Sequence, residues 1–331
     1  MTYEIALVGA GRIGQIHAES IKAHPELTLR YVIDPNASNA LAAASRSNAA
    51  ATSLEAALAD PSVDAVVVAS STDAHLTHCL ATHRAGKAIF CEKPIGLDLT
   101  KVKSARSELA AARMLVGFNR RFDRHFMKLT ARVSDGTIGR IETVQITSND
   151  PAPPPISYIP ASGGLFRDMS IHDFDMARYL LDEEPSEVFA TGSCLIDPMI
   201  GEAGDIDTAR IILRTTSGRM CVIANSRRSG FGYDQRIEVF GSEGMVTAQN
   251  EKESTVQVWN QSGCHTDGLL NFFLQRYADA YQAEMDHFVD LIAGRAKSLI
   301  TFSDGEAALR VAEAASESLN MGRPVQISLA T

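Results

Sequence analysis

Three residues of types that move protons and stabilise alkoxides stand out by their setting in the chain. Lys93 lies in the tripeptide Glu92-Lys93-Pro94, directly after an apolar run, and Asp168 precedes His172 by four positions. A histidine, whose ordinary pKa is about 6.5, suits proton transfer near neutrality, and a carboxylate can orient its ring and stabilise its cation. A lysine ammonium can donate to an oxygen on which negative charge develops. These residue types predict acid–base chemistry at a hydroxyl group.

Each motif also has an interpretation without chemistry. A lysine before proline is commonly a solvated residue of a turn, and Asp168 could be a helix cap that precedes a packed histidine. Asp173 and Asp175 are competing carboxylates, but on a helix they would point to other faces. The assignment of roles is open as well, because either His172 or Lys93 could take the hydroxyl proton.

A glycine-rich segment near the N-terminus has the spacing of a dinucleotide-binding turn. Gly9-Ala10-Gly11-Arg12-Ile13-Gly14 fits G-x-G-x-x-G, follows a predicted strand and opens a predicted helix. The glycines allow a tight turn, close approach to a pyrophosphate, and close packing of helix on strand. Asp34 lies 20 residues after Gly14, where a carboxylate can bond the ribose hydroxyls and repel a 2′-phosphate. The pattern predicts NAD as the cofactor, in preference to NADP.

Polar residues follow the apolar run at 63–69. Ser70-Ser71-Thr72 comes at the carboxyl end of this predicted strand, the edge at which doubly wound sheets bind ligands. Ser71 and Thr72 are therefore candidates for cofactor contact and, equally, for a helix cap. His75 and His78 on the next predicted helix are expected to be packing or surface residues rather than ligands.

Strands and helices alternate over the first third of the chain. This alternation predicts a doubly wound parallel sheet, a Rossmann-type fold, over residues 1–118. The predicted strands are 4–8, 27–33, 63–69, 88–91 and 114–118, and the predicted helices are 13–23, 37–47, 54–59, 74–85 and 99–112.

The pattern changes after residue 118. Glycines punctuate a series of short strand-like runs, which indicates a mostly antiparallel meander within a second domain, 119–331. The fold class expected for the whole chain is therefore α/β followed by α+β. The predicted strands are 141–148, 188–194, 209–214, 220–225, 236–240, 245–248 and 255–259, and the predicted helices are 120–134, 170–181, 272–292 and 306–319.

Composition and charge exclude several classes of protein. The chain has 331 residues, 45% hydrophobic and 21% charged, which is typical of a globular protein of about two domains. The net charge is −9, and the first 118 residues have 11 basic and 11 acidic side chains, so the excess negative charge lies in the second domain. Neither domain is basic, which argues against nucleic acid or a membrane as partner and favours a small molecule.

The five cysteines lack any C-x-x-C pair. A disulfide framework and a zinc site are therefore not expected, and no other cluster with metal-ligand spacing is seen. The chain shows no signal peptide and no apolar run of membrane-spanning length. A cytoplasmic protein is expected.

The motifs occur in the order found in a known family. With Gly9–Gly14, Glu92-Lys93-Pro94 and Asp168 followed by His172, the chain resembles the oxidoreductase family named for glucose-fructose oxidoreductase, inositol dehydrogenase and rhizopine catabolism (Gfo/Idh/MocA). The resemblance covers essentially the whole chain. The E-K-P motif marks the family, and the stretches 117–123, 150–155, 163–175 and 232–236 resemble its inositol branch.

The resemblance implies roles at matching positions. Lys93, Asp168 and His172 match the catalytic set, which also contacts substrate. Arg120 and Tyr233 match positions near bound inositol, whereas Asn119, Asp150 and Ser170 lie in segments that vary within the branch. The residues that match NAD contacts are Gly9, Gly11, Arg12, Ile13 and Asp34, with Glu92 and Lys93 beside the nicotinamide.

The resemblance also implies a reaction and an assembly. The expected reaction is the NAD-dependent oxidation of myo-inositol to 2-keto-myo-inositol, by a homotetramer assembled through a large open sheet in the second domain. Three alternatives stay open: a dehydrogenase for another inositol isomer or a pyranose sugar, an NAD-dependent glycosidase that re-reduces its substrate, and an NAD-sensing regulator without catalysis. No helix-turn-helix segment or basic patch supports the regulator.

Overall fold

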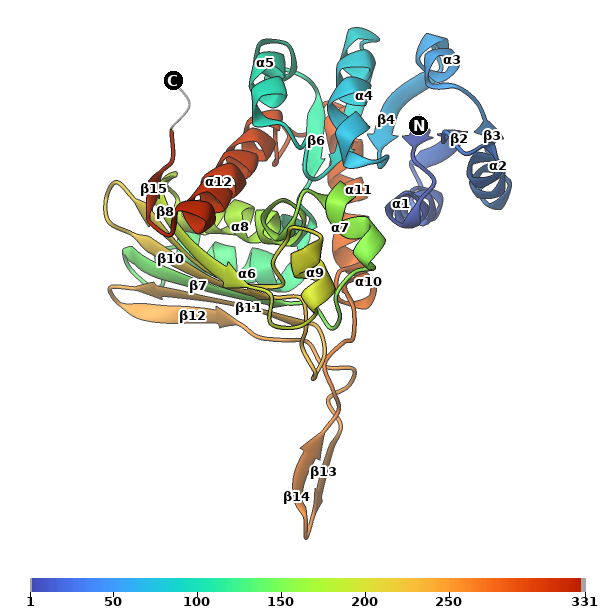
Figure 1. Ribbon diagram of the computed structural model, residues 1–331. Helices are drawn as coiled ribbons and strands as arrows, with labels where there is room; N and C mark the ends of the chain where they lie inside the picture. The colour runs from blue at the N-terminus through green and yellow to red at the C-terminus, as the bar shows by residue number, and fades with distance from the viewer. Residues whose placement is uncertain (1, 329–331) are drawn as a thin grey trace. The chain divides into compact units, whose positions relative to one another are not determined.

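The computed structural model describes residues 2–328, which divide into two compact units. The first unit comprises the chain up to Phe122 together with Ala280–Leu309, and the second comprises Asp123–Asp279 together with the chain from Arg310 (Figure 1). The division expected after residue 118 follows the order of the chain and therefore leaves out the segment that returns to the first unit.

A six-stranded parallel sheet forms the centre of the first unit, in the order β3-β2-β1-β4-β5-β6. The change of direction in strand order lies between β1 and β4, the place where doubly wound sheets bind ligands. Apolar runs without alternation form β4 and β5, as expected for strands covered on both faces. The strands are β1 (Tyr3–Val8), β2 (Leu27–Ile33), β3 (Ala50–Ala51), β4 (Val63–Val68), β5 (Ala88–Glu92) and β6 (Met114–Gly117).

Three helices of the first unit, α2, α3 and α5, begin where a side chain caps the backbone. Asn36, Ser53 and Asp98 each accept hydrogen bonds from backbone N–H groups of the helix that follows. The helices are α1 (Arg12–Ala23), α2 (Ala37–Arg46), α3 (Leu54–Ala59), α4 (Thr72–Arg84), α5 (Leu99–Leu109), a 3-10 turn η1 (Asn119–Phe122) and α11 (Ala278–Ile292), most of which belongs to this unit.

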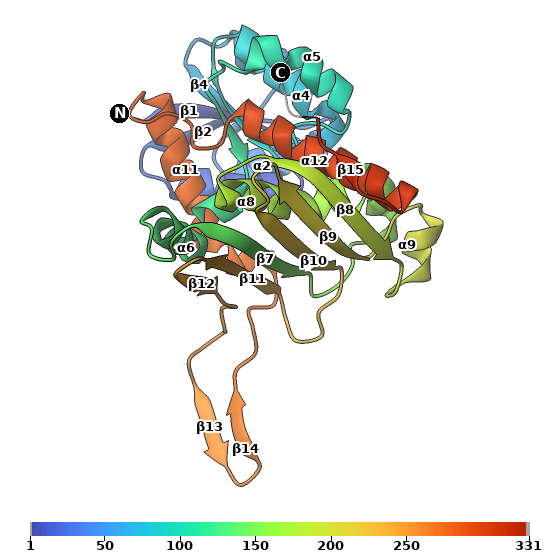
Figure 2. The same ribbon diagram turned by 90° about the vertical axis from the view of Figure 1, so that its left-hand side faces the viewer.

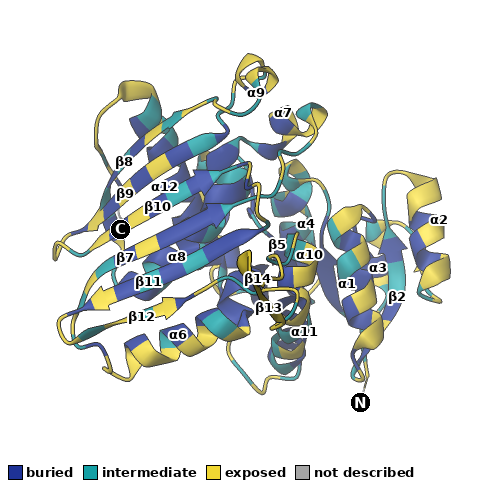
Figure 3. Ribbon diagram, turned by 90° about the horizontal axis from the view of Figure 1, so that it is seen from below, coloured by how far each residue is buried: buried dark blue, intermediate teal, exposed yellow. Residues whose placement is uncertain are grey.

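A seven-stranded sheet forms the centre of the second unit, in the order β12-β11-β7-β10-β9-β8-β15. Only β7 and β10 pair in parallel, so the expectation of a mostly antiparallel sheet is confirmed. Buried and exposed residues alternate along β9 (Figure 3), which is typical of a sheet covered on one face. The strands are β7 (Ile141–Asn149), β8 (Pro185–Ser193), β9 (Thr208–Thr215), β10 (Met220–Ser226), β11 (Asp234–Gly241), β12 (Gly244–Ala248) and β15 (Val325–Gln326).

A two-stranded hairpin extends from the second unit, away from its large sheet (Figure 1, Figure 2). Its strands are β13 (Gln257–Asn260), which overlaps the predicted strand 255–259, and β14 (Gly263–Thr266), which was not predicted. All eight of these strand residues are exposed. The helical segments of this unit are α6 (Arg124–Ser134), η2 (Ile156–Tyr158), α7 (Ile159–Ser162), η3 (Phe166–Ser170), α8 (Ile171–Leu181), α9 (Pro198–Glu202), α10 (Phe273–Arg276) and the later part of α12 (Phe302–Met321).

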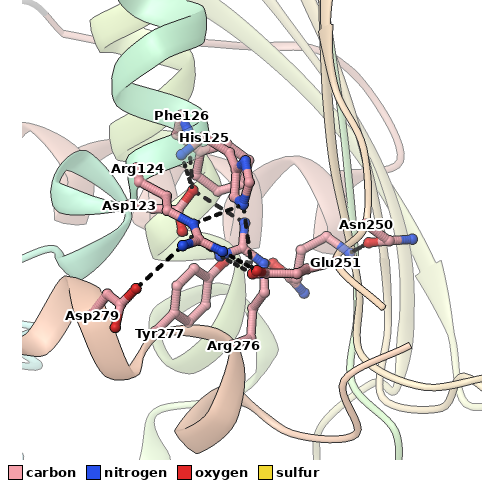
Figure 4. Close-up of polar contacts among 10 residues, drawn as sticks. Asp123, Arg124, His125, Phe126, Asn250, Glu251, Arg276, Tyr277 and Asp279 are labelled. Atoms are coloured by element: carbon pink, nitrogen blue, oxygen red, sulfur yellow. Dashed lines mark hydrogen bonds and ion pairs between the residues drawn. The ribbon is translucent and has the colours of Figure 1, made fainter. Parts of the chain in front are cut away.

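Two predicted helices are interrupted near one buried ion pair. The predicted helix 120–134 is divided into η1 and α6, because the Asp123 carboxylate accepts hydrogen bonds from the N–H groups that open α6. The predicted helix 272–292 is divided at Tyr277, between α10 and α11. Arg276, at the end of α10, pairs with Asp123, and the two residues are 5% and 3% exposed (Figure 4). Since an unpaired buried charge is unfavourable, this pair fixes where both helices stop or start.

No helix within residues 2–328 has both the length and the apolar character needed to cross a membrane.

Candidate active site residues in the two units

The turn between β1 and α1 needs two of its glycines for the fold and leaves the third facing open space. Gly9 has a φ of +101°, and a methyl group built on it would lie 2.3 Å from the Ala69 carbonyl oxygen. A methyl group on Gly14 would lie 1.9 Å from the Gly9 oxygen, so only glycine lets α1 pack this closely. A methyl group on Gly11 would meet no protein atom within 4 Å. This leaves a cradle at Gly11 into which a ligand fits.

The first turn of α1 is suited to an anion. Its N-cap is Gly11, which has no side chain to bond the first N–H groups, and the turn holds no acidic residue. Arg12 and Ile13 open the helix at the predicted place. Backbone N–H groups at a helix start, together with the helix dipole, bind phosphate groups.

Asp34 lies one residue beyond β2 and bonds to the glycine turn. Its Oδ2 accepts from the Ala10 N–H at 2.7 Å, and its Oδ1 accepts from the Asn36 N–H at 2.8 Å. Each carboxylate oxygen can still accept a further hydrogen bond. The carboxylate is therefore held beside the turn, where ribose hydroxyls are expected.

Ser71 and Thr72 lie where β4 leads into α4. Ser71 is the N-cap of α4 and is exposed, but its hydroxyl makes no capping hydrogen bond. Ser70 Oγ lies 3.1 Å from His78 Nδ1.

Glu92 and Lys93 lie at the carboxyl end of β5, on the same sheet edge as the glycine turn. Glu92 Oε1 lies 2.6 Å from Nε2 of His17, a fully buried residue of α1. Glu92 Oε2 accepts from the Lys93 N–H at 3.3 Å, and the Lys93-Pro94 peptide bond is cis. His17 escaped the sequence analysis, although it follows Gly14 by three positions and so lies on one side of α1 with it. Arg120, in η1 after β6, is 3% exposed.

Asp168 and His172 lie on either side of a change in helix type. Phe166–Ser170 is a π-helix, and the α-helix begins only at Ile171, so the α-helical spacing assumed for this pair does not apply throughout. Asp168 accepts from the Tyr158 hydroxyl at 3.1 Å and pairs with Arg227 at 3.2 Å. Arg227 is 1% exposed and also reaches Asp205 at 3.4 Å. Arg227 is not among the site residues that the sequence predicted.

The start of α8, which holds His172, is tied to the large sheet by buried polar groups. Ser170 Oγ donates to Asn225 Oδ1 at 2.6 Å, and Asn225 Nδ2 donates to Asp173 Oδ2 at 2.8 Å. Ser148 Oγ of β7 donates to the other oxygen of Asp173 at 2.5 Å. Asp173 is therefore a structural residue rather than a competing acid or base, and it holds the helical turn on which His172 lies.

Two other polar residues of the second unit are buried. Asp175, the other competing carboxylate, is fully buried and lies 3.7 Å from Arg178. Tyr233, just before β11, is 7% exposed, its N–H donates to the Leu270 oxygen, and its ring packs edge-on against Tyr277.

The structure thus gathers the predicted residues within each unit. In the first, the glycine turn, Asp34, Ser71, Thr72, Glu92 and Lys93 all lie at carboxyl ends of parallel strands. In the second, Asp168 lies in η3, His172 lies in the first turn of α8, and Tyr233 precedes β11. Within residues 2–328, no three His, Cys, Asp or Glu side chains are grouped to hold a metal ion.

The strand order, the glycine turn and Asp34 define a dinucleotide-binding Rossmann domain. The chain belongs to the Gfo/Idh/MocA family. Residues 3–119 match the family description "Oxidoreductase family, NAD-binding Rossmann fold", and residues 126–247 match the "GFO/IDH/MocA C-terminal domain". The protein is therefore an NAD-binding oxidoreductase.

Relatives of the chain match over its whole length. It is 44% identical to the inositol 2-dehydrogenase of Rhizobium meliloti (strain 1021), over 99% of this chain and 100% of that protein. It is 45% identical to the myo-inositol 2-dehydrogenase of Thermotoga maritima, over 98% of each. Among solved structures, a putative myo-inositol dehydrogenase from Sinorhizobium meliloti 1021 superposes with a TM-score of 0.95 at 44% identity, covering 99% and 100% of the two chains. A scyllo-inositol dehydrogenase from Lactobacillus casei with bound NAD(H) and scyllo-inositol gives 0.91 at 28% identity, covering 99% of each.

Alanine substitutions at Gly11 and Gly14 should separate cofactor binding from folding. Gly11→Ala places its methyl group in the open cradle, so we expect the dissociation constant for NAD to rise about tenfold, or ~1.4 kcal/mol, with an unchanged unfolding temperature. Gly14→Ala places its methyl group against the Gly9 oxygen, and such overpacking should cost about 1–3 kcal/mol of stability. Calorimetric NAD titration and thermal unfolding measure the two effects. Unchanged NAD affinity in Gly11→Ala would show that the pyrophosphate does not approach this residue.

Proposed function

We propose that the protein oxidises myo-inositol to 2-keto-myo-inositol with NAD⁺ as the hydride acceptor. The proposal is carried by one observation within each unit: Lys93 lies at the ligand edge of the NAD-binding sheet, and Asp168 precedes His172 where η3 leads into α8. Full-length relatives at 44% and 45% identity that are named inositol 2-dehydrogenases support the choice of substrate.

The proposed mechanism divides the work among these side chains. Bound NAD⁺ supplies an acceptor, at nicotinamide C4, for the hydride of the carbinol carbon. His172 takes the hydroxyl proton, so the products are the ketone, NADH and a proton. Asp168 orients the imidazole and stabilises its cation, and Lys93 donates to the oxygen as negative charge develops on it.

Arg227 supports the proposed role of Asp168. A buried guanidinium at 3.2 Å restrains the Asp168 carboxylate, and the Tyr158 hydroxyl bonds it at 3.1 Å. A general base works only when its orienting partner is itself fixed, because small displacements of reacting groups are expensive in rate.

The remaining contacts are assigned by position. We place inositol against Arg120 and Tyr233 as well as the acid–base set. We propose that NAD lies along the carboxyl edge of the sheet in the first unit and contacts Gly9, Gly11, Arg12, Ile13, Gly14, Asp34, Ser71, Thr72, Glu92 and Lys93.

We infer that the large sheet of the second unit joins subunits of a homotetramer. Ile212, Met220, Val222, Phe240 and Met245 are each 42–52% exposed. They share one face, since Val222 pairs with Ile212 and Phe240 with Met245 in the strand register. Exposed apolar patches of this kind mark protein interfaces. Light scattering that gives a monomer mass at assay concentration would contradict the inference.

A cytosolic location fits the cysteines. All five are free thiols, and Cys79, Cys91 and Cys221 are buried. Reduced thiols are the rule in the cytosol, where NAD⁺ is also available.

A substrate panel tests the proposed reaction. The purified enzyme is incubated with NAD⁺ and either myo-inositol, scyllo-inositol, D-chiro-inositol or D-glucose, and NADH is followed by its ultraviolet absorbance. We expect the highest kcat/KM with myo-inositol, and a much lower value when NADP⁺ replaces NAD⁺, because the Asp34 carboxylate repels the 2′-phosphate. A higher kcat/KM with another ring compound would change the assigned substrate but leave the proposed cofactor and acid–base residues in place. No NADH from any compound, with cofactor still bound, would favour the glycosidase or the regulator.

Replacing His172 tests the proton acceptor. His172→Ala should lower kcat by about 10²–10⁴ at saturating inositol, while NAD binding stays intact. The pH profile of kcat/KM should also lose its acid limb, because that limb reports ionisation of the base. If Lys93→Met abolishes the limb and His172→Ala retains it, the two roles are reversed.

A further inference from the structure

Two buried histidines on different helices contact the turn Glu92-Lys93-Pro94. His17 lies on α1 and is 0% exposed, and His75 lies on α4 and is 1% exposed. Neither belongs to the acid–base set proposed above. Both contacts lie within the first unit, so they bear directly on how Lys93 is held.

His17 reaches Lys93 through Glu92. The ring N–H at Nε2 donates to Glu92 Oε1 at 2.6 Å, and Glu92 Oε2 accepts from the Lys93 N–H at 3.3 Å. The His17 ring packs edge-on against Phe90, with centroids 4.8 Å apart, and against Tyr281 at 5.9 Å. Its Nδ1 is buried and makes no hydrogen bond within the described residues. The carboxylate of Glu92 is therefore the polar group that orients this ring.

His75 holds the other side of the turn. Its Nδ1 lies 2.8 Å from the Pro94 carbonyl oxygen, and its Nε2 lies 3.0 Å from the Ser70 carbonyl oxygen. A carbonyl only accepts, so a neutral ring donates to one of them. Burial lowers the pKa of His75, which favours the neutral ring. We assign the hydrogen to Nδ1, because the contact with Pro94 is the shorter.

One further titratable group near this turn lies on another element, α11. Glu284 of α11 is fully buried, and burial, with a smaller effect of Glu92, raises the pKa of its carboxyl well above the usual range. The charge of Glu92 raises the pKa of His75, and the charge of Lys93 lowers it.

We propose that His17 and His75 are positioning residues for Lys93. The proposal rests on the role given to Lys93 in the proposed function. His17 acts through the Glu92 carboxylate and His75 through the Pro94 carbonyl. Each joins the turn to an element beside the cofactor: α1, which follows the glycine turn, and the segment Ser70–Thr72, which opens α4. The position of the lysine is thereby coupled to α1 and α4, the helices that follow the glycine turn and Ser71.

Asparagine and glutamine substitutions distinguish the ring nitrogens. Asparagine places its amide nitrogen near the position of histidine Nδ1, and glutamine places it near Nε2. His17→Gln should therefore keep the bond to Glu92, and His17→Asn should lose it. At position 75 the order is reversed, so His75→Asn should keep the bond to Pro94 and His75→Gln should lose it. A general effect of removing an imidazole cannot produce opposite orders at the two positions.

We expect kcat to fall about tenfold to a hundredfold in His17→Asn and His75→Gln, the effect of a displaced reacting group. His17→Gln and His75→Asn should stay within about threefold of the parent enzyme, well inside that range. The ionisation that Lys93→Met removes from the pH profile should shift in the two impaired variants. His83, a half-buried residue of α4, provides the control, since His83→Asn and His83→Gln should retain the parent kcat and pH profile.

Other outcomes overturn the proposal. Equal losses in both substitutions at a position, in step with a lower unfolding temperature, would make that histidine a structural residue. Parent activity and an unchanged pH profile in all four variants would show that Lys93 needs neither contact. Parent activity in Lys93→Met would refute the proposed role of the lysine itself, a failure that the histidine variants alone do not produce.

Discussion

The close packing of Gly14 against the Gly9 carbonyl is the constraint on which the first unit depends. Because no side chain fits between them, α1 starts directly from the turn, and no side chain caps its first N–H groups. The same start point fixes which residues of α1 point inward. His17, three positions on, is placed against Glu92 at the end of β5, beside Lys93. One backbone contact therefore sets both the cofactor turn and the neighbourhood of the lysine.

The second unit positions its residues with side chains rather than with backbone packing. Asn225 of β10 bonds to both Ser170 and Asp173. Its amide oxygen accepts from the Ser170 hydroxyl, and its amide nitrogen donates to the Asp173 carboxylate. Arg227 pairs with Asp168, which lies in the helical turn that precedes His172. Ser170, Asn225 and Asp173 each have a partner in this network, so a single apolar replacement there would leave several buried polar groups without partners.

Local patterns in the sequence predicted the parallel sheet, the glycine turn and Asp34, because each depends on residues close together in the chain. Contacts between distant segments could not be predicted in this way. His17 meets Glu92 across 75 positions, and Asp168 meets Arg227 across 59. The break at Tyr277 depends on the buried pair of Arg276 with a residue 153 positions away. The return of Ala280–Leu309 to the first unit likewise leaves no local signal. The π-helix at Asp168 shows that even helical spacing can mislead where helix type changes.

The hairpin β13–β14 carries the single tryptophan of the chain, Trp259, and leaves it 74% exposed. An indole in that position already has the surroundings of an indole in an unfolded chain. Its emission is therefore a poor reporter of the folding of the core. The seven tyrosines, of which Tyr233, Tyr277 and Tyr281 are buried, are the chromophores whose signal follows the interior. The indole instead reports whatever covers the hairpin, which makes it a natural label for association between chains.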